Sequence, residues 1–542
     1  MLLCYIFQRL TDSVPIMKTK QLPLNRRQFL KQSCMAGATI ALSGMIPGCA
    51  GIALQKLPDI NYTNGINLRN CNIVDVINGK IISNGTIMIR NGIIDLIIDH
   101  NPYHNYGAAE IDIQNHYVLP GLIDAHCHTT MPSTSSFSLS QIMTNYRQIQ
   151  RNYIQQLKSG VTTVRDMGAL PLLLHKMIQK IESRQMPGPN VQFCNAITNA
   201  YGAHPDIDLK DVSFLAPYFA SFTGYSNLWY RNTSDLVTKF KDNVKKASFV
   251  KLTMDKKSIL CGKGTIPTYT QEDLRIIFRL ADEYNIPIAG HMLTKYGFDR
   301  ALDFGIHSME HTIGDAIIND HDISLMAEKG CAIVPTMSMA QIFATEEAIT
   351  DLPQDYQNDF ILNELTLRRH YINQFHDAYV EPSIHSANQK TLSLYRQYGC
   401  DNLHRLGYIQ SNPRLFFGIL KYGPNHLKKM YNAGVIIGCG TDAGVPFIYH
   451  GMLWREMEML TRIGFSTIDV IRFATINNAK ILRMNSEIGS IELEKKADFM
   501  VVKENPFHNL KTLRKPSLVI KGGRIEFAQK HYLKFMDTHP TT

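Results

Sequence analysis

Val118-Leu-Pro-Gly-Leu-Ile-Asp-Ala-His-Cys-His128 is an apolar run that ends in two histidines separated by one residue. Side chains alternate across a β-strand, so His126 and His128 point to one face and Cys127 points to the other. Two imidazoles that converge from the end of one strand form half of a metal site. The apolar run before them argues against the alternative, two surface histidines on a turn. The stretch therefore predicts a strand that ends in metal ligands.

The body of the chain, about 119–483, alternates short apolar strands with helical patterns. With the strand of His126 there are eight strand candidates, and the other seven begin near Thr162, Val191, Phe249, Ile288, Ile306, Ile333 and Val435. Repeated βα units predict an α/β fold with a closed (β/α)8 TIM barrel, which places its chemistry at the carboxyl ends of the strands. Residues 340–430 lack strand signals and predict a helical insertion, which either covers the mouth of the barrel or lies on the surface without a role.

Both ends of the chain have a different sequence pattern from the body, with short strands separated by turns. Residues 64–118 read as short alternating strands with turns at Asn78-Gly79, Asn84-Gly85 and Asn91-Gly92. Apolar strands punctuated by glycine also follow the body. We therefore expect residues 50–118 and 484–542 to pair into one small, discontinuous β-sandwich domain.

Residues 1–49 are expected to be an export signal and not part of the folded domain. Asn25-Arg-Arg-Gln-Phe-Leu-Lys31 precedes a mildly apolar run and resembles a twin-arginine export signal; the run is too short to span a membrane. Ile46-Pro-Gly-Cys49 resembles a lipoprotein processing site, and one lipidated cysteine would anchor a soluble domain to a membrane surface. We expect an exported chain, periplasmic or anchored through Cys49, that starts at Met1 or Met17. The alternative is a basic amphipathic N-terminus without an export role.

The composition is that of a globular enzyme and not of a nucleic-acid-binding protein. The chain has 542 residues, of which 44% are hydrophobic, and a net charge of +9. Residues 1–50 hold six Lys or Arg against one Asp, so they contribute +5, and the +4 that remains is unremarkable for the rest of the chain. No basic stripe interleaved with aromatic residues occurs. Ten cysteines without a CxxC spacing predict buried small hydrophobes and no disulfide framework.

Further metal-binding residue types stand at the ends of later strands. Lys251 lies inside the apolar strand Phe249-Val-Lys-Leu, where a lysine is costly unless it is modified, paired or neutral. His291 and His311 end the fifth and sixth strands, and Asp442 follows the eighth. Four histidines, one lysine and one aspartate thus project from strands one, four, five, six and eight.

Taken in order, these residues resemble the amidohydrolase superfamily, specifically its imidazolonepropionase-like and Xaa-Pro dipeptidase-like metal hydrolases. The matching pieces include Pro120–His128, Gly160–Asp166, Phe249–Lys251, Gly305–His311, Pro335-Thr336 and Gly440–Gly444. The resemblance extends over roughly 64–525. No single piece is decisive, but the ordered set is specific.

The resemblance implies a centre of two divalent metal ions. The ligands that it implies for the more buried ion are His126, His128 and Asp442, and those for the other ion are His291 and His311. Lys251, carboxylated by carbon dioxide, would bridge both ions. Zinc suits such a histidine-rich set, with manganese or cobalt as alternatives. Metal-activated water would attack a carbonyl, and Asp442 would act as the general acid and base.

Two segments depart from the pattern of the relatives. Where relatives show a Thr-Gly-Gly-His type of segment, this chain has Asn199-Ala-Tyr-Gly-Ala-His204, and His204 either contacts the substrate as a catalytic residue or is a plain loop histidine. After Lys251, residues 253–264 replace a Gly-Gly loop and are expected to line the pocket. Tyr201 and Tyr269 are candidate substrate contacts; the alternative for each is packing.

We also expect three polar residues to support the barrel or the ligands and not to touch the substrate. Arg165 and Asp166, at the end of the second strand, would fix the barrel, and Glu310 would be a structural partner of the ligands.

The function expected from these residues is metal-dependent hydrolysis of an amide bond in a small molecule, such as a dipeptide or an N-acyl amino acid. A cyclic-amide hydrolase and a mononuclear ring deaminase are alternatives, and Lys251 argues against the deaminase. A non-catalytic binding lipoprotein on a dead hydrolase fold is a third reading, against which the intact ligand set argues. We expect a small-molecule substrate, no nucleic acid, and a homo-oligomer.

Overall fold

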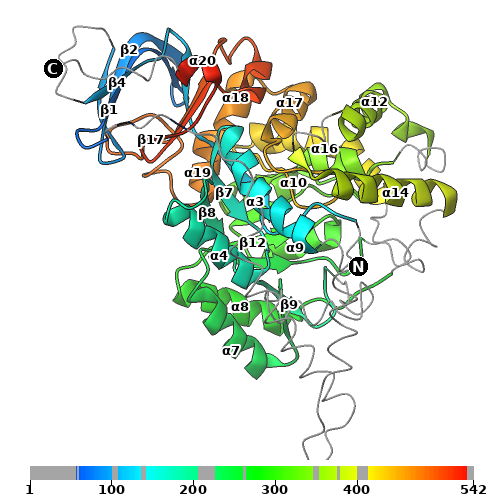
Figure 1. The fold of residues 1–542 in the computed structure, drawn as a ribbon. Coiled ribbons are helices and arrows are strands. Elements are labelled where there is room, and N and C mark those ends of the chain that lie inside the picture. Colours follow the sequence, from blue (N-terminus) through cyan, green and yellow to red (C-terminus); the bar gives the residue numbers. More distant parts are fainter. Residues whose placement is uncertain are drawn as a thin grey trace, which may run out of the picture. The chain divides into compact units, whose positions relative to one another are not determined.

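The computed structural model describes residues 57, 60, 62–99, 108–135, 142–205, 226–259, 264–345, 353–374, 379–398 and 413–533. The export signal expected over 1–49 lies outside these residues. The described part is a mixed α/β structure (Figure 1). Within it, no helix combines the length and apolar character needed to cross a bilayer.

One eight-stranded sheet is built from both ends of the chain. The N-terminal part supplies β1 (Ile66–Asp75), β2 (Lys80–Arg90), β3 (Ile93–Ile98), β4 (Ala109–Asp112) and β5 (Tyr117–Pro120), and the C-terminal part supplies β15 (Phe499–Val502), β16 (Leu518–Lys521) and β17 (Arg524–Ala528). The order is β17-β16-β15-β5-β1-β2-β3, with β4 beside β1. The two parts join where β15 runs antiparallel to β5, and Figure 1 shows blue and red strands together there. A sandwich of two layers stays a prediction.

The turn expected at Asn84-Gly85 is wrong, because β2 continues through both residues. Asn84 has a left-handed φ of 56°, and the register of β2 against β1 shifts between the pairs Cys71–Gly85 and Ile73–Ile82. The left-handed residue therefore marks a bulge inside a strand. The turns at Asn78-Gly79 and Asn91-Gly92 do connect β1 to β2 and β2 to β3.

Parallel strands form the body of the structure. They are β6 (Leu122–Cys127), β7 (Val161–Asp166), β8 (Asn190–Phe193), β9 (Ile197–Ala200), β10 (Asn227–Tyr230), β11 (Val250–Thr253), β12 (Ile288–His291), β13 (Ser308–Glu310) and β14 (Ala332–Val334). They pair as β6-β7-β8, as β9-β10, and as β11-β12-β13-β14. The sequence pattern did not predict β9 or β10.

The eighth predicted strand is present only as bridges between its neighbours. Ile437 bridges Ile333 in parallel, and the Ala125 amide donates to the carbonyl of Cys439 at 3.1 Å. Residues 435–439 therefore lie between β14 and β6. This position brings the segment after Cys439 next to the end of β6.

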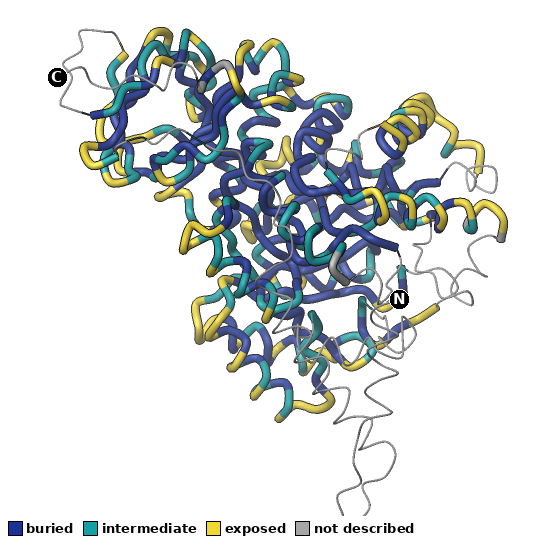
Figure 2. The backbone as a smooth tube through the Cα atoms, viewed as in Figure 1, coloured by how far each residue is buried: buried dark blue, intermediate teal, exposed yellow. Residues whose placement is uncertain are grey.

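Helices follow most of these strands. They are α3 (Ile142–Lys158), α4 (Pro171–Glu182), α7 (Thr233–Val244), α8 (Gln271–Glu283), α9 (Lys295–Asp303), α10 (Asp320–Glu328), α17 (Leu453–Ile463), α18 (Thr467–Arg472), η5 (Phe473–Asn477) and α19 (Asn478–Ile481). Many start at a side chain that accepts from the amide three residues on; the caps are Asn232, Thr270, Thr294, Asn319 and Ser466. Short elements η6 (Leu510–Arg514) and α20 (Lys530–Leu533) flank β16 and β17. Figure 2 shows buried strands inside and exposed residues along the outer faces of the helices.

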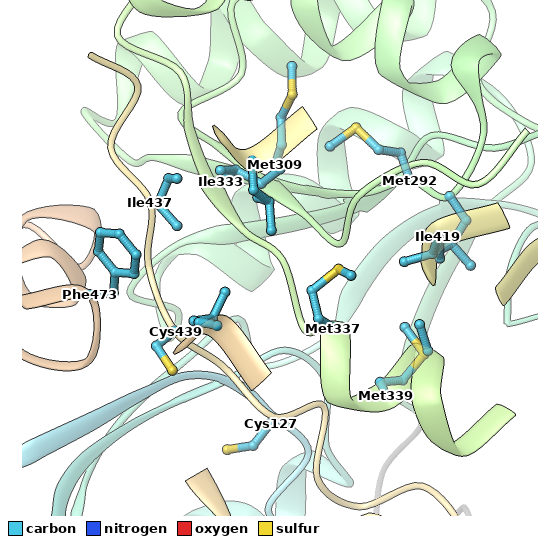
Figure 3. Close-up of a cluster of buried hydrophobic side chains, with 14 of the residues drawn as sticks. Cys127, Met292, Met309, Ile333, Met337, Met339, Ile419, Ile437, Cys439 and Phe473 are labelled. Carbon is cyan, nitrogen blue, oxygen red and sulfur yellow. The ribbon is translucent and has the colours of Figure 1, made fainter. Parts of the chain in front are cut away.

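Sulfur-containing side chains fill part of the core next to the strand ends. Met292, Met309, Met337 and Met339 gather there with isoleucine side chains (Figure 3). Methionine suits an irregular space, because its unbranched side chain adapts to its neighbours. Cys127 lies in the same core, on the face of β6 opposite to its histidines, as alternation along the strand requires.

The stretch 340–430 is helical where it is described. It contains the end of α11 (Met337–Phe343), η3 (Gln354–Tyr356), α12 (Asp359–Gln374), α14 (Pro382–Tyr398) and most of α16 (Pro413–Asn432). Asn388 of α14 accepts from the Ser135 amide at 2.8 Å and donates to the Ser133 carbonyl at 2.8 Å. Helix α14 is thus bonded to the loop that follows His128. A cover over the mouth stays a prediction.

We expect Asn388→Ala to lower the free energy of unfolding by about 2–4 kcal/mol, because it leaves a buried amide and a buried carbonyl without partners. Urea unfolding followed by circular dichroism measures the change. Lys390→Ala, on the exposed side of the same helix, is the control and should change stability by less than about 0.5 kcal/mol. Equal effects of the two variants would contradict this role for Asn388.

Candidate metal centre

The side chains predicted as metal ligands converge from the ends of separate strands. His126 and His128 come from the end of β6, His311 follows β13, and Asp442 follows residues 435–439. The nearest ligand atoms of His126, His311 and Asp442 all lie within 4.8 Å of one another. Oδ1 of Asp442 lies 3.3 Å from Nε2 of His126 and 3.2 Å from Nε2 of His128.

His291 lies on the other side of His311. Its ring centroid is 4.7 Å from that of His311, and the His311 centroid is 4.7 Å from that of His126. The rings therefore form a continuous row from β6 to β12. This row has the donors for more than one metal ion.

Three of the histidines are held through Nδ1 by groups outside the row. Nδ1 of His126 bonds to Oε2 of Glu310 at 2.8 Å, and Nδ1 of His128 bonds to the Gly168 carbonyl at 2.7 Å. Nδ1 of His311 bonds to Oγ1 of Thr336 at 2.5 Å. A hydrogen bond at one ring nitrogen orients the other nitrogen as a metal ligand. Nε2 of each ring is thereby directed to the shared space.

Left-handed backbone conformations aim several of these side chains. His311 has φ 73°, Thr336 has φ 46° and Asp442 has φ 59°. Non-glycine residues in this region are uncommon, cost roughly 1–3 kcal/mol each, and cluster at functional sites. Three such residues follow three neighbouring strands, which is typical of a functional site.

A close approach of the segment 440–444 to β6 requires glycine. A Cβ at Gly440 would lie 2.7 Å from Cβ of His126, and a Cβ at Gly444 would lie 2.6 Å from the carbonyl oxygen of His128. No larger residue fits at either position without moving the backbone that carries the histidines. The two glycines therefore let Asp442 reach both rings.

Glu310 and Arg165 form a buried ion pair beneath the histidines. Oε1 of Glu310 accepts from the Arg165 guanidinium at 2.6 Å, and both side chains are almost completely buried. Burial raises the pKa of Glu310, but the Arg165 charge and the bond from His126 outweigh it and hold that pKa below its ordinary range. Glu310 therefore stays anionic and accepts the Nδ1 proton of His126. This is the supporting place expected for both residues.

Asp442 is also kept ionised. Burial raises the pKa of its carboxyl group, but the hydrogen bonds to His126 and His128 outweigh burial and hold the pKa well below its ordinary value. Asp442 is therefore an anion between the two rings. It lies where a ligand or a proton acceptor is needed.

Lys251 on β11 has a buried amine with no hydrogen-bond partner among the described residues. Burial lowers its pKa to about 8. An unpartnered buried amine is costly as it stands, and conversion to a carbamate would give it anionic oxygens that metal ions can satisfy. The donor set, with four imidazoles, one carboxylate and this lysine, fits a pair of divalent cations.

The predicted substrate contacts lie in three different settings. The His204 ring stacks on His291, with centroids 4.5 Å apart, and its carbonyl accepts from Oγ1 of Thr253 at 3.0 Å. Tyr201 is 55% exposed beyond the end of β9. Tyr269 is buried, and its hydroxyl donates to the Thr198 carbonyl.

Three residues at the centre had no role assigned from the sequence: Thr336, Gly168 and Asp255. Oδ2 of Asp255 lies 3.8 Å from Nε2 of His291. Thr336 belongs to a matching piece, but only its tertiary contact with His311 shows its role. Asp255 stands four residues after Lys251, where relatives have a glycine loop, and that departure was the one available signal.

Comparisons with known proteins indicate the family and the fold of the chain. A family model described as Amidohydrolase family matches residues 117–525. An uncharacterized protein of Mycobacterium tuberculosis is 21% identical over 413 residues, which cover 75% of this chain and 85% of that protein.

Solved structures of similar fold extend over most of the chain. A Xaa-Pro dipeptidase with bound methionine has a TM-score of 0.61 and 23% identity, covering 86% of this chain and 100% of that chain. A putative prolidase from Bifidobacterium longum has a TM-score of 0.61 and 22% identity, covering 88% and 99%. These likenesses establish a TIM-barrel-like α/β fold.

We expect Thr336→Val to weaken zinc binding by about 10–100-fold, because His311 loses the group that orients its ring. Valine keeps the branched Cβ, so backbone strain changes little. Competition with a chromophoric chelator measures the affinity of each ion. Thr336→Ser keeps the hydroxyl and should bind zinc like the wild type. If serine and valine weaken zinc binding equally, the hydroxyl has no such role.

Proposed function

The chain belongs to the amidohydrolase family and is a hydrolase of carbon–nitrogen bonds, and we propose that it cleaves the amide bond of a small molecule such as a dipeptide or an N-acyl amino acid. The observation that carries this proposal is the row of imidazoles around Asp442, with three rings held through Nδ1 and a buried lysine amine beside them. Such an arrangement of buried groups is unfavourable in the metal-free protein and becomes favourable when cations bind.

Two divalent metal ions, zinc first among them, would be held by six side chains. His126, His128 and Asp442 would hold one ion, His291 and His311 the other, and a carbamate on Lys251 both. When bound, such ions supply a Lewis acid that polarises a carbonyl group and lowers the pKa of water. The low pKa of Asp442 and the neutral state of His291 and His311, whose pKa values burial depresses, suit them as ligands.

Asp442 would also move the proton that hydrolysis requires. Its carboxylate would accept a proton from the attacking water and pass it to the leaving nitrogen. The residue beside it is fixed for this task, because Thr441 donates through Oγ1 to Oδ2 of buried Asp124 at 2.7 Å. A fixed turn keeps the carboxylate in place while its charge changes.

His204 would contact the substrate. Its ring lies against His291, so a group held between the metal ligands and the loop after β9 would meet it. The names of two structures of similar fold, a Xaa-Pro dipeptidase and a putative prolidase, support a substrate with an amide bond next to an amino-acid carboxylate. Tyr201 is a further candidate for a contact at the rim.

We also infer a complete (β/α)8 barrel, supported by the bridges of Ile333 to Ile437 and of Cys127 to Ala443. Export through the twin-arginine-like segment, lipidation of Cys49 and assembly into a homo-oligomer are proposals supported by the sequence alone. Folding and metal loading before export would be consistent with metal binding coupled to folding.

We expect Asp442→Asn to lose amine release by at least about 10³-fold while it retains more of its metal than of its turnover, because asparagine cannot take up a proton. The substrate panel contains L-dipeptides, including Xaa-Pro, N-acyl amino acids, cyclic amides and amino-purines. Metal content is measured on the same samples. Near-native turnover in this variant would remove Asp442 from proton transfer, and turnover on cyclic amides or purines alone would replace the proposed substrate class.

We expect zinc uptake by the metal-free protein to depend on carbon dioxide and on pH. Only the neutral amine reacts with carbon dioxide, and with a pKa of about 8 the uncharged fraction of Lys251 rises between roughly pH 6 and pH 9. At each pH, uptake is compared in bicarbonate and in buffer freed of carbon dioxide; the difference should grow with pH and level off above pH 9. Lys251→Met should show no difference. Equal uptake in the two wild-type samples would exclude the carbamate.

A further inference from the structure

His291 differs from the other three histidines of the row. Its Nε2 is buried and has no hydrogen-bond partner among the described residues, whereas His126, His128 and His311 each have a bond at Nδ1. The acceptor that faces Nε2 is Oδ2 of Asp255, at 3.8 Å. Asp255 is not among the residues that the sequence predicts for the centre.

The carboxylate of Asp255 is fixed by the start of α9. Its Oδ2 accepts from the Leu293 amide at 2.7 Å, and its Oδ1 accepts from the amide of Thr294 at 3.3 Å and from the Thr294 hydroxyl. A Cβ at Gly297 would lie 2.5 Å from Oδ1, so this position of α9 has no room for a side chain. Asp255 is thus a buried, immobile acceptor between β11 and α9.

The plane of the His291 ring is fixed as well. His204 stacks on one face of it with an interplanar angle of 18°, and His311 meets it at 76°. These contacts leave the two ring nitrogens facing different groups. With Nε2 toward Asp255, Nδ1 is the nitrogen left for the centre.

We propose that Asp255 is a positioning residue of the metal centre, which accepts a hydrogen bond from Nε2 of His291 and so presents an unprotonated Nδ1 to the second metal ion. This inference rests on the proposed function of the centre. A shift of less than 1 Å converts the 3.8 Å separation into a hydrogen bond. His291 would then bind through the opposite nitrogen from the other three histidines, each held by its own partner.

A merely structural role for Asp255 predicts something different. As a cap of α9 it would stabilise the fold through Leu293 and Thr294 without affecting which nitrogen of His291 carries the proton. Asp255→Asn keeps one of the two oxygens that accept from those donors and replaces the other with an amide nitrogen, which cannot accept. Thr294→Val removes one donor to Asp255 and leaves the carboxylate in place. The two variants therefore separate the two roles.

The first test is titration of the metal-free full chain with zinc alone against a chelator. We expect Asp255→Asn to bind one ion as the wild type does and the second about 10–100-fold more weakly. Thr294→Val should bind both ions with wild-type affinity and lose only thermal stability. Wild-type affinity for both ions in Asp255→Asn would overturn the proposal, as would equal weakening of the second ion by both variants.

The second test needs no change at Asp255. Nitrogen-15 NMR of the ring nitrogens in the metal-free wild type reports the tautomer, with His291 assigned by its loss in His291→Gln. A proton on Nε2 is expected, and a proton on Nδ1 would overturn the proposal. Failure of the wild type to bind any metal would instead overturn the proposed function, so the two failures are distinguishable.

Discussion

A buried carboxylate, that of Glu310, joins the strands on which the centre depends. It bonds to Arg165 of β7 at 2.6 Å and to His126 of β6 at 2.8 Å, and all three side chains are almost completely buried. Removing one partner from a buried ion pair costs roughly 3–5 kcal/mol, because a charge is left uncompensated. These bonds therefore link the register of β6, β7 and β13 to the position of one metal ligand. The buried ion pair lies below the ligands and supports them.

Three of the four histidines in the row are each held by an element other than their own. His126 is held from β13, His128 from the loop after β7, and His311 from the segment after β14. The rings can therefore move apart only if the strands do. The left-handed backbone conformations of His311, Thr336 and Asp442 are unfavourable by themselves. They persist here because the surrounding hydrogen bonds hold them in place.

Burial acts on these groups in a consistent direction. It lowers the pKa of His291 and His311, so that their lone pairs are free near neutral pH, and it lowers the pKa of Lys251 to about 8, so that part of this amine is uncharged there. Hydrogen bonds keep Asp442 ionised. Metal ions bind deprotonated ligands, so a ligand that has already lost its proton avoids the free-energy cost of deprotonation on binding. The same burial makes the metal-free centre unfavourable, which couples the stability of this region to its cations.

Local patterns in the sequence determined the strands of the body and the residue types at their ends. An apolar run with a terminal histidine leaves a signal within a few residues, and the ordered set of such runs marked His126, His128, Lys251, His291, His311 and Asp442 as one group. The similar texture of both chain ends also predicted that they pair, and β15 does run beside β5. Only the tertiary structure decided which residues support these ligands.

Glu310 and His126 are 184 positions apart in the sequence, and Asn388 and Ser135 are 253 positions apart, so no periodicity or spacing connects them. Asp255 became visible as a partner of His291 only once β11 and α9 were packed together, because a hydrogen bond depends on where two chains meet in space and not on their distance along the sequence.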